Sequence, residues 1–320
     1  MDIASEQLQL TQIFLSYAYK RSLDMRDTGR RFVHYTSAEN AAKIIRNREV
    51  WMRKSSVMND FMEVEHGMDC LTFAWNGDNG DRFKKALNNL FPNLADELEC
   101  LFYAWVPQFR RESYLTSMSE HEDSEDELGR LSMWRAYGNV SGVAVVLNPT
   151  VFLTPSVALK AYTSPVAYFT REQFKVEFDQ VTDAIERSTD FLRGREKKDT
   201  LTWLFDMFRF ALLCTKHPGF HEEREWRIIY SPKYEQSNRL KRCIVTIRGT
   251  PQPIYKIPLE DVPDEGLLNA SVPGIVNRVI IGPTRYPLDI RETFIELLEQ
   301  AGLDDAASRV CISLIPLRTE

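Results

Sequence analysis

The chemistry-bearing residue nearest the N-terminus is His34, an imidazole at the end of an expected strand. Arg31–Tyr35 is a run of β-favourable residues. Thr36 and Glu39 have the spacing of a capping box, which predicts that the strand leads directly into a helix. An imidazole held in this way can bind a ligand or transfer a proton, although a lone histidine is more often a satisfied core residue. A function for His34 therefore requires a partner elsewhere in the chain.

Glu225 is the candidate partner, a carboxylate at the start of a second expected strand, Arg224–Tyr230. The two-residue period of a strand places Glu225 and Arg227 on one face and the apolar side chains on the other. A carboxylate in this position could stabilise a developing positive charge or accept a proton. The alternative is an ion pair with Arg227 or Arg224, an arrangement that is common and contributes little at a surface.

A third segment, Leu131–Tyr137, contributes two aromatic side chains. Its residues predict a short helix followed by a buried strand, Gly142–Leu147. Trp134 and Tyr137 are three residues apart and share a helix face, so they could stack on a flat heteroaromatic ring. By themselves, they are ordinary core aromatics.

Other histidines and cysteines give weaker signals. Cys214, His217 and His221 have spacings that a metal or a cysteine nucleophile could use, but no second cysteine pair completes a set of four ligands. We therefore predict no metal site. His66 and His121 lie in polar stretches and are expected to be solvated. The five cysteines are scattered, with no Cys-x-x-Cys pair, and indicate reduced, mostly packed thiols.

The composition is that of a soluble globular protein, for which the cytoplasm is the expected location. Apolar residues are 43% and charged residues 27% of the 320 residues. Residues Met1–Leu10 lack the basic start and apolar run of a signal peptide. Charges interrupt every apolar stretch well before the roughly 20 residues of a membrane-spanning helix. A net charge of −6 creates no overall field that attracts nucleic acid, although a local basic groove would be compatible with it.

The expected organisation is a single α+β domain over residues 1–320. We predict an N-terminal helix at about 5–27 and helical insertions at about 61–106 and 171–216, where apolar residues recur at helical spacing. The acidic run Ser119–Glu127 is expected to be a solvated loop. Short strands with helices grouped between them favour mixed or antiparallel sheets over regular βαβ alternation. No glycine-rich phosphate loop is present.

Taken together, these segments resemble a widespread bacterial family that is named only as a domain of unknown function, family 2971. The resemblance spans about Phe32 to Arg318 and rests on the order of four motifs. These are the opening aromatic-x-His-Tyr-Thr, the Ser-x-Met-Trp-x-x-Tyr before a glycine-led strand, the Glu-x-Glu-Trp-Arg of Glu223–Arg227, and the ending Ile-Gly-Pro to Ile-Pro-Leu-Arg. The family in turn looks like the ADP-ribosyltransferases, whose site is a His, Tyr, Glu triplet.

The resemblance implies a split β-sandwich of two mixed or antiparallel sheets with helical insertions, and NAD as substrate. His34, with the neighbouring Tyr35 and Thr36, matches the histidine motif that binds the ribose and adenosine side of NAD. Tyr137, or in its place Trp134, matches the aromatic that stacks on nicotinamide. Glu225 matches the catalytic glutamate.

The function that this resemblance implies is NAD-dependent ADP-ribosyl transfer by a bacterial toxin or phage-defence effector. The acceptor would be a protein, DNA or RNA, an antitoxin or defence-system protein is a candidate partner, and no membrane partner is expected. Two alternatives stay open: an NAD glycohydrolase, and a non-catalytic binding or adaptor module on the same fold. An ion pair of Glu225 with Arg227 would favour the module.

Overall fold

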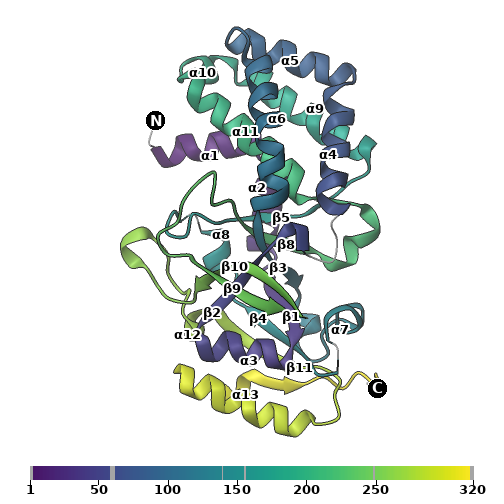
Figure 1. Ribbon diagram of the computed structural model, residues 1–320, viewed down its shortest axis with the longest axis vertical. Coiled ribbons are helices and arrows are strands. Elements are labelled where there is room, and N and C mark those ends of the chain that lie inside the picture. The colour runs from purple at the N-terminus through teal and green to yellow at the C-terminus, as the bar shows by residue number, and fades with distance from the viewer. Residues whose placement is uncertain (1–2, 58–61, 139, 155, 248, 318–320) are drawn as a thin grey trace. The chain divides into compact units, whose positions relative to one another are not determined.

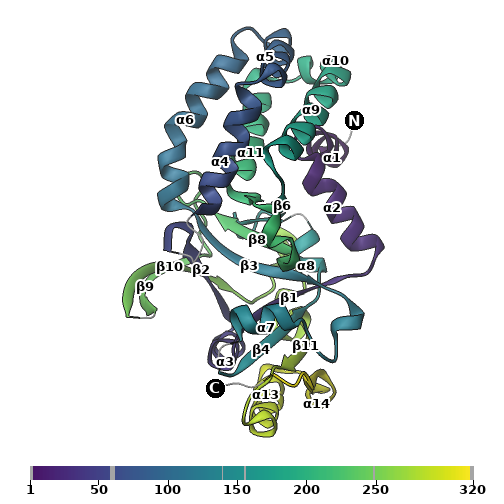
Figure 2. The ribbon, with the colours of Figure 1, turned by 90° about the vertical axis from the view of Figure 1, so that its right-hand side faces the viewer.

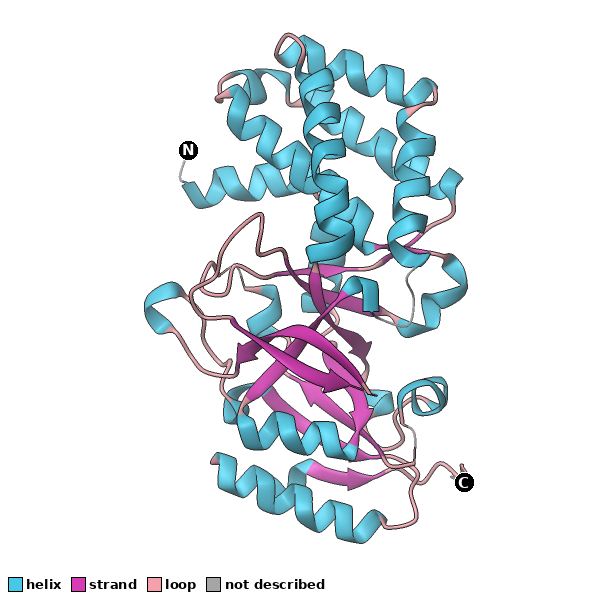
Figure 3. Ribbon diagram, in the orientation of Figure 1, coloured by secondary structure: helices cyan, strands magenta, loops and turns pink. Residues whose placement is uncertain are grey.

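The computed structural model describes residues 3–57, 62–138, 140–154, 156–247 and 249–317 (Figure 1). They form two compact units, a mostly helical one and one built around a β-sheet (Figure 3). The helical unit is made from residues 1–24, 55–113 and 164–221, and the sheet unit from residues 25–54, 114–163 and 222–320. Both predicted helical insertions fall in the helical unit. The interpretation of the chain as a single domain stays a prediction.

The helical unit consists of long helices that bury stripes of aromatic and aliphatic side chains. Phe174 and Phe178 on one helix and Phe205 and Phe208 on another are buried, as their spacing predicts. The elements are α1 (Ile3–Phe14), α2 (Ser16–Asp27), η1 (Ser55–Val57), α4 (Met62–Trp75), α5 (Asp78–Leu90), α6 (Leu94–Glu112), β6 (Ala167–Tyr168), α9 (Arg171–Arg187), α10 (Thr189–Arg193), α11 (Lys197–Cys214), β7 (Thr215–Lys216) and η3 (Pro218–Glu223). The single N-terminal helix expected at 5–27 is instead divided into α1 and α2 at Leu15.

The sheet unit contains a mixed ten-stranded sheet, which confirms the α+β class. Its strands are β1 (Arg31–Ser37), β2 (Glu49–Lys54), β3 (Tyr114–His121), β4 (Gly142–Leu147), β5 (Tyr162–Pro165), β8 (Glu225–Tyr230), β9 (Lys241–Ile247), β10 (Thr250–Pro258), β11 (Val276–Ile281) and β12 (Val310–Ile312). The main order is β12-β11-β4-β1-β3-β2-β10-β9, with β8 paired to β3 and β5. Most described strands thus belong to one branched sheet, and β6 and β7 form a separate pair. The split β-sandwich of two sheets stays a prediction.

Strand β3 is the place where this sheet divides. β8 pairs with Tyr114–Ser119 along one edge of β3. On the other edge, Leu115 pairs with Arg53 of β2, whereas Ser119 pairs with Val33 of β1. β2 and β1 therefore pair with two separate stretches of the same edge of β3, and Ser117 lies in the gap between these pairings. We call this point the fork.

Two helices pack against each other and against strands at the β11 and β12 end of the sheet (Figure 2). Helix α3 (Ala38–Asn47) contacts β4, and helix α13 (Pro287–Ala301) contacts β11 and β12. Ile45, Val145 and Phe294 are among the buried residues of this core. The remaining short elements of the unit are η2 (Asp123–Glu125), α7 (Leu131–Tyr137), α8 (Thr150–Leu153), η4 (Pro263–Glu265), α12 (Val272–Ile275) and α14 (Ala306–Arg309).

The start of α3 differs from the predicted capping box. Strand β1 stays paired with β4 as far as Ser37, which therefore becomes the N-cap. The Ser37 hydroxyl accepts a hydrogen bond from the backbone N–H of Asn40. Glu39 forms an ion pair with Lys43 one helical turn later, at 2.5 Å. The cap thus lies one residue later than the sequence pattern indicated.

Across the described ranges, no helix is both long enough and apolar enough to span a membrane.

Candidate functional site

Ser117 is the residue on which two of the predicted site residues converge. The Nδ1 atom of His34 lies 2.9 Å from the backbone carbonyl oxygen of Ser117. The Ser117 hydroxyl donates a 2.5 Å hydrogen bond to Oε1 of Glu225. β1, β3 and β8 thus bring His34 and Glu225, which are far apart in the sequence, to one position at the fork. The His34 imidazole thus bonds β3 at Ser117, in the stretch of β3 that pairs with neither β2 nor β1.

Glu225 is bound by arginine as well as by serine. The Nε atom of Arg227 donates to Oε1 of Glu225 at 2.9 Å, and a terminal nitrogen donates to Oε2 at 3.1 Å. Both side chains are buried, with 8% of Glu225 and 2% of Arg227 exposed. The ion pair that the sequence offered as an alternative is therefore present, but in the interior rather than at the surface. There, the loss of one partner is far more costly than at the surface.

The protonation of His34 follows from its surroundings. Burial lowers the pKa of His34 below its usual 6.5, and the hydrogen bond to Ser117 opposes this only in part. A carbonyl oxygen can only accept, so Nδ1 of the neutral ring must carry the proton. Nε2 is then the acceptor, and no hydrogen-bond partner for it is found among the described residues. His34 can therefore accept a hydrogen bond from a ligand hydroxyl.

Tyr137 is an accessible aromatic residue that contacts the segment leading into β8. Its side chain is 38% exposed, and its hydroxyl donates to the Glu223 carboxylate at 3.4 Å. Glu223 immediately precedes Arg224 and lies two residues before Glu225. Tyr137 at the end of α7 is thus tied to the start of β8, on the side where Glu225 enters the sheet.

Trp134 has a structural role instead, which corrects its assignment as a stacking residue. Only 2% of the side chain is exposed, and its indole N–H donates to the Leu128 carbonyl at 2.8 Å. A β-carbon at Gly129, Gly142 or Gly282 would lie less than 3.2 Å from an atom of this indole. The ring therefore fills a space that three glycines leave open, and no face of it is available to a ligand.

Tyr35 and Thr36 are also engaged within the protein. Tyr35 is 6% exposed and packs edge-to-face on Trp134, with ring centroids 4.9 Å apart. Its hydroxyl accepts a hydrogen bond from the backbone N–H of Arg130 at 2.9 Å, and burial raises its pKa. The Thr36 hydroxyl accepts from the Asn40 amide at 3.4 Å. Of the expected NAD-binding residues, His34 and Tyr137 are thus the ones whose positions suit contact with a ligand.

The acidic run Ser119–Glu127 is an ion-pair network, not the solvated loop that its charge suggested. It continues β3 into η2, and its carboxylates pair mostly with arginines from distant segments. The arginine pairs are Glu120 with Arg30, Glu122 with Arg30 and Arg224, Asp123 with Arg31, Glu125 with Arg130 and Arg224, and Asp126 with Arg31 and Arg278. Because all of these arginines except Arg130 are far away in sequence, the local pattern could not reveal the network.

Two histidines expected in solvent are packed. His121 is fully buried, its Nε2 lies 2.9 Å from Asp126, and burial lowers its pKa. His66 in the helical unit is partly buried and lies 2.9 Å from the Phe169 carbonyl oxygen. Among the described residues, no group of three histidine, cysteine or acidic side chains is arranged to hold a metal ion, Cys214, His217 and His221 included. The described cysteines are all free thiols.

Sequence reasoning missed Ser117 because it missed the whole of β3. The signal was present in Tyr114 and Thr116, which favour strands, but the alternation was hidden because residues on both faces of the strand are buried. Because acidic residues follow, the sequence predicted a loop in this region. The centre of the site is therefore on the strand that the pattern concealed.

Comparisons with known proteins give one match. No curated protein and no solved structure matches the chain. Residues 133–228 match the model of a family described as "Protein of unknown function (DUF2971)". The match runs from α7 to β8, so it includes Tyr137 and Glu225 but neither His34 nor Ser117. It supports the resemblance to this family of unknown function.

Proposed function

We propose that the sheet unit is an NAD-dependent ADP-ribosyltransferase whose reacting centre lies at the fork. The observation that carries the proposal is the convergence of His34 and Glu225 on Ser117. Tyr137 adds an exposed ring tied to Glu223, next to the same strand. These are the three residue types that the ADP-ribosyltransferase resemblance assigns to the site.

The chemistry assigned to each residue follows from the reaction. The bond between nicotinamide and C1′ of the ribose breaks, its electron pair leaves with nicotinamide, and the acceptor's nucleophile forms the new bond to C1′. The ribose develops oxocarbenium character on the way, which a carboxylate stabilises only in the transition state. Glu225 supplies this charge and can accept the proton that the nucleophile loses.

The surrounding groups fit a nicotinamide nucleotide in part. The unprotonated Nε2 of His34 is an acceptor for a ribose hydroxyl, and the exposed ring of Tyr137 is a platform for a flat heterocycle. Arg227 works against the assignment because its positive charge offsets that of Glu225. The acceptor is a protein, DNA or RNA, as for a toxin or phage-defence effector.

The test is nicotinamide release from labelled NAD, with candidate acceptors present. We expect Glu225→Gln to lower the rate on the order of 100-fold, the loss typical of one electrostatic contact to the transition state. Glu222→Gln, an exposed carboxylate nearby, is the matched control and should leave the rate unchanged. Equal rates for the wild type and Glu225→Gln would refute the catalytic role. Free ADP-ribose without a labelled acceptor would identify hydrolysis instead.

A second candidate, a non-catalytic binding module, is favoured by the buried ion pair of Glu225 with Arg227. A ligand that binds only the folded state raises stability by about 2.7 kcal/mol at a hundredfold excess over Kd. Thermal unfolding with millimolar NAD separates the two. A module that does not use NAD should show no shift in Tm and no nicotinamide release.

A further inference from the structure

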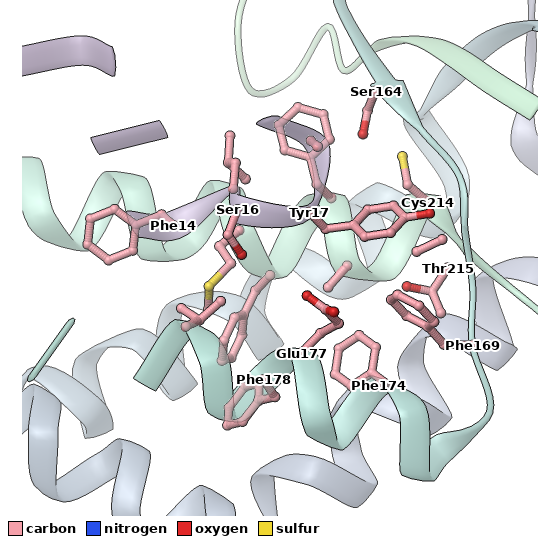
Figure 4. A pocket seen from close by; sticks show the side chains of 18 of the residues that line it. Phe14, Ser16, Tyr17, Ser164, Phe169, Phe174, Glu177, Phe178, Cys214 and Thr215 are labelled. Atoms are coloured by element: carbon pink, nitrogen blue, oxygen red, sulfur yellow. The ribbon is translucent and has the colours of Figure 1, made fainter. Parts of the chain in front are cut away.

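The helical unit contains an apolar cavity with one carboxylate in its wall (Figure 4). Its volume is about 110 Å³, and every lining residue belongs to that unit. The wall is formed by the junction of α1 and α2, the segment before α9, and the facing sides of α4, α9 and α11. Rings from four of these segments face it, including Phe14, Tyr17, Phe169 and Phe174.

Glu177 on α9 is the exception in this wall. Oε1 accepts a 3.1 Å hydrogen bond from the Gln180 amide, and the Gln180 carbonyl accepts from Lys20 at 2.8 Å. Oε2 is buried and has no hydrogen-bond partner in the part of the chain that the structure describes. Figure 4 shows the carboxylate pointing in among the lining side chains. The Lys20–Gln180 pair thus orients the carboxylate and leaves one oxygen directed at the cavity.

An ionised carboxylate oxygen can only accept a hydrogen bond, so the missing partner of Oε2 is a ligand with an N–H or O–H donor. A cationic donor is preferred because hydrogen bonds between opposite charges are about twice as strong as neutral ones. Aromatic faces add to this preference through their negative electrostatic potential. The size limits the rest of the ligand: the volume of about 110 Å³ is smaller than the cavity of about 150 Å³ that accommodates benzene, so the body must be a short alkyl group rather than a ring.

We propose that this cavity binds a small protonated primary amine with a short branched alkyl body, the ammonium group on Glu177 Oε2 and the body among the rings. This site is separate from the fork and does not depend on the function proposed there. Water on Oε2 is the competing occupant, and it would give no preference for an amine.

The experiment measures binding of isobutylamine and isobutanol to the full chain by calorimetry. The two probes share a branched alkyl group and differ in whether the polar group is charged. We expect isobutylamine to bind at least tenfold more tightly than isobutanol, and Glu177→Gln to remove this difference. Glu172→Gln, an exposed carboxylate on the same helix, is the matched control and should keep it. Ala211→Leu, which adds volume to the wall, should weaken both probes.

Three results would overturn the proposal. They are equal affinities of the wild type for the two probes, undiminished isobutylamine binding by Glu177→Gln, and no measurable binding of isobutylamine to the wild type. The comparison of the two probes on the wild type needs no variant, so the proposal can be tested even if a substitution prevents folding.

Discussion

Each unit holds a glutamate carboxylate with at least one buried oxygen, and the partners of the two carboxylates differ. In the sheet unit, Glu225 receives a serine hydroxyl and two nitrogens of Arg227. In the helical unit, Glu177 receives one amide hydrogen bond, and its second oxygen faces an apolar cavity. Burial alone therefore does not tell what a carboxylate does. The number of hydrogen-bond partners distinguishes a carboxylate that stabilises the fold from one that can bind a ligand.

The sharpest test of this contrast is replacement of Glu225 by methionine. Glu225→Met deprives the buried Arg227 of its carboxylate partner and should lower the free energy of unfolding by about 3–5 kcal/mol. The double variant Glu225→Met/Arg227→Met should recover most of this loss, because a well-packed apolar pair often replaces a buried ion pair without penalty. Urea denaturation measures both. A loss below about 1 kcal/mol in the single variant would argue against a structural ion pair.

Removal of the Ser117 hydroxyl should have a smaller effect. Ser117→Ala deletes a hydrogen bond to a charged group, so we expect a loss of about 1.5–3 kcal/mol in the free energy of unfolding. Ser119→Ala, two residues farther along β3, is the control. If both variants lose the same amount, the hydroxyl of Ser117 is not a specific support for Glu225.

The corresponding change in the helical unit should have the opposite sign. Glu177→Met removes a buried oxygen that has no partner and adds an apolar side chain to an apolar wall. We expect the free energy of unfolding to rise by about 1 kcal/mol, the lower end of the cost of an unsatisfied buried group. The same urea experiment checks this. A loss of stability would mean that Glu177 is integrated into the fold in the way Glu225 is.

The smallest expected effect is the dependence of the free energy of unfolding on pH. It arises in the sheet unit, where burial lowers the pKa of both His34 and His121. Below pH 6.5, the unfolded chain binds protons that the folded protein does not, so stability should fall as the pH decreases. Each unit of pKa depression corresponds to about 1.4 kcal/mol at most.

The measurement is the free energy of unfolding at pH 7.5 and 5.5. His34→Gln, whose amide can still donate to the Ser117 carbonyl, should show a shallower fall than the wild type. A parallel fall in both proteins would contradict a neutral His34 in the folded state.

The sequence predicted what depends on local periodicity and missed what depends on distant partners. The stripes of Phe174 and Phe178 predicted α9 correctly, and the β-favourable run around His34 predicted β1. The partners of Asp123 and Glu125 come from segments about a hundred residues away, so the acidic run was misinterpreted. The sequence also did not reveal the cavity at Glu177, because its wall is formed by helices from both ends of the unit's sequence.

The fork in the sheet also has a mechanical meaning. On one edge of β3, the His34 imidazole of β1 bonds Ser117 in the gap between the pairings of β1 and β2, whereas β8 on the other edge runs past the gap without interruption. β8 therefore connects the two halves of the sheet on the side opposite the gap. Arg227 of β8 pairs with Ser117, so the ion pair of Glu225 and Arg227 lies where the two halves meet.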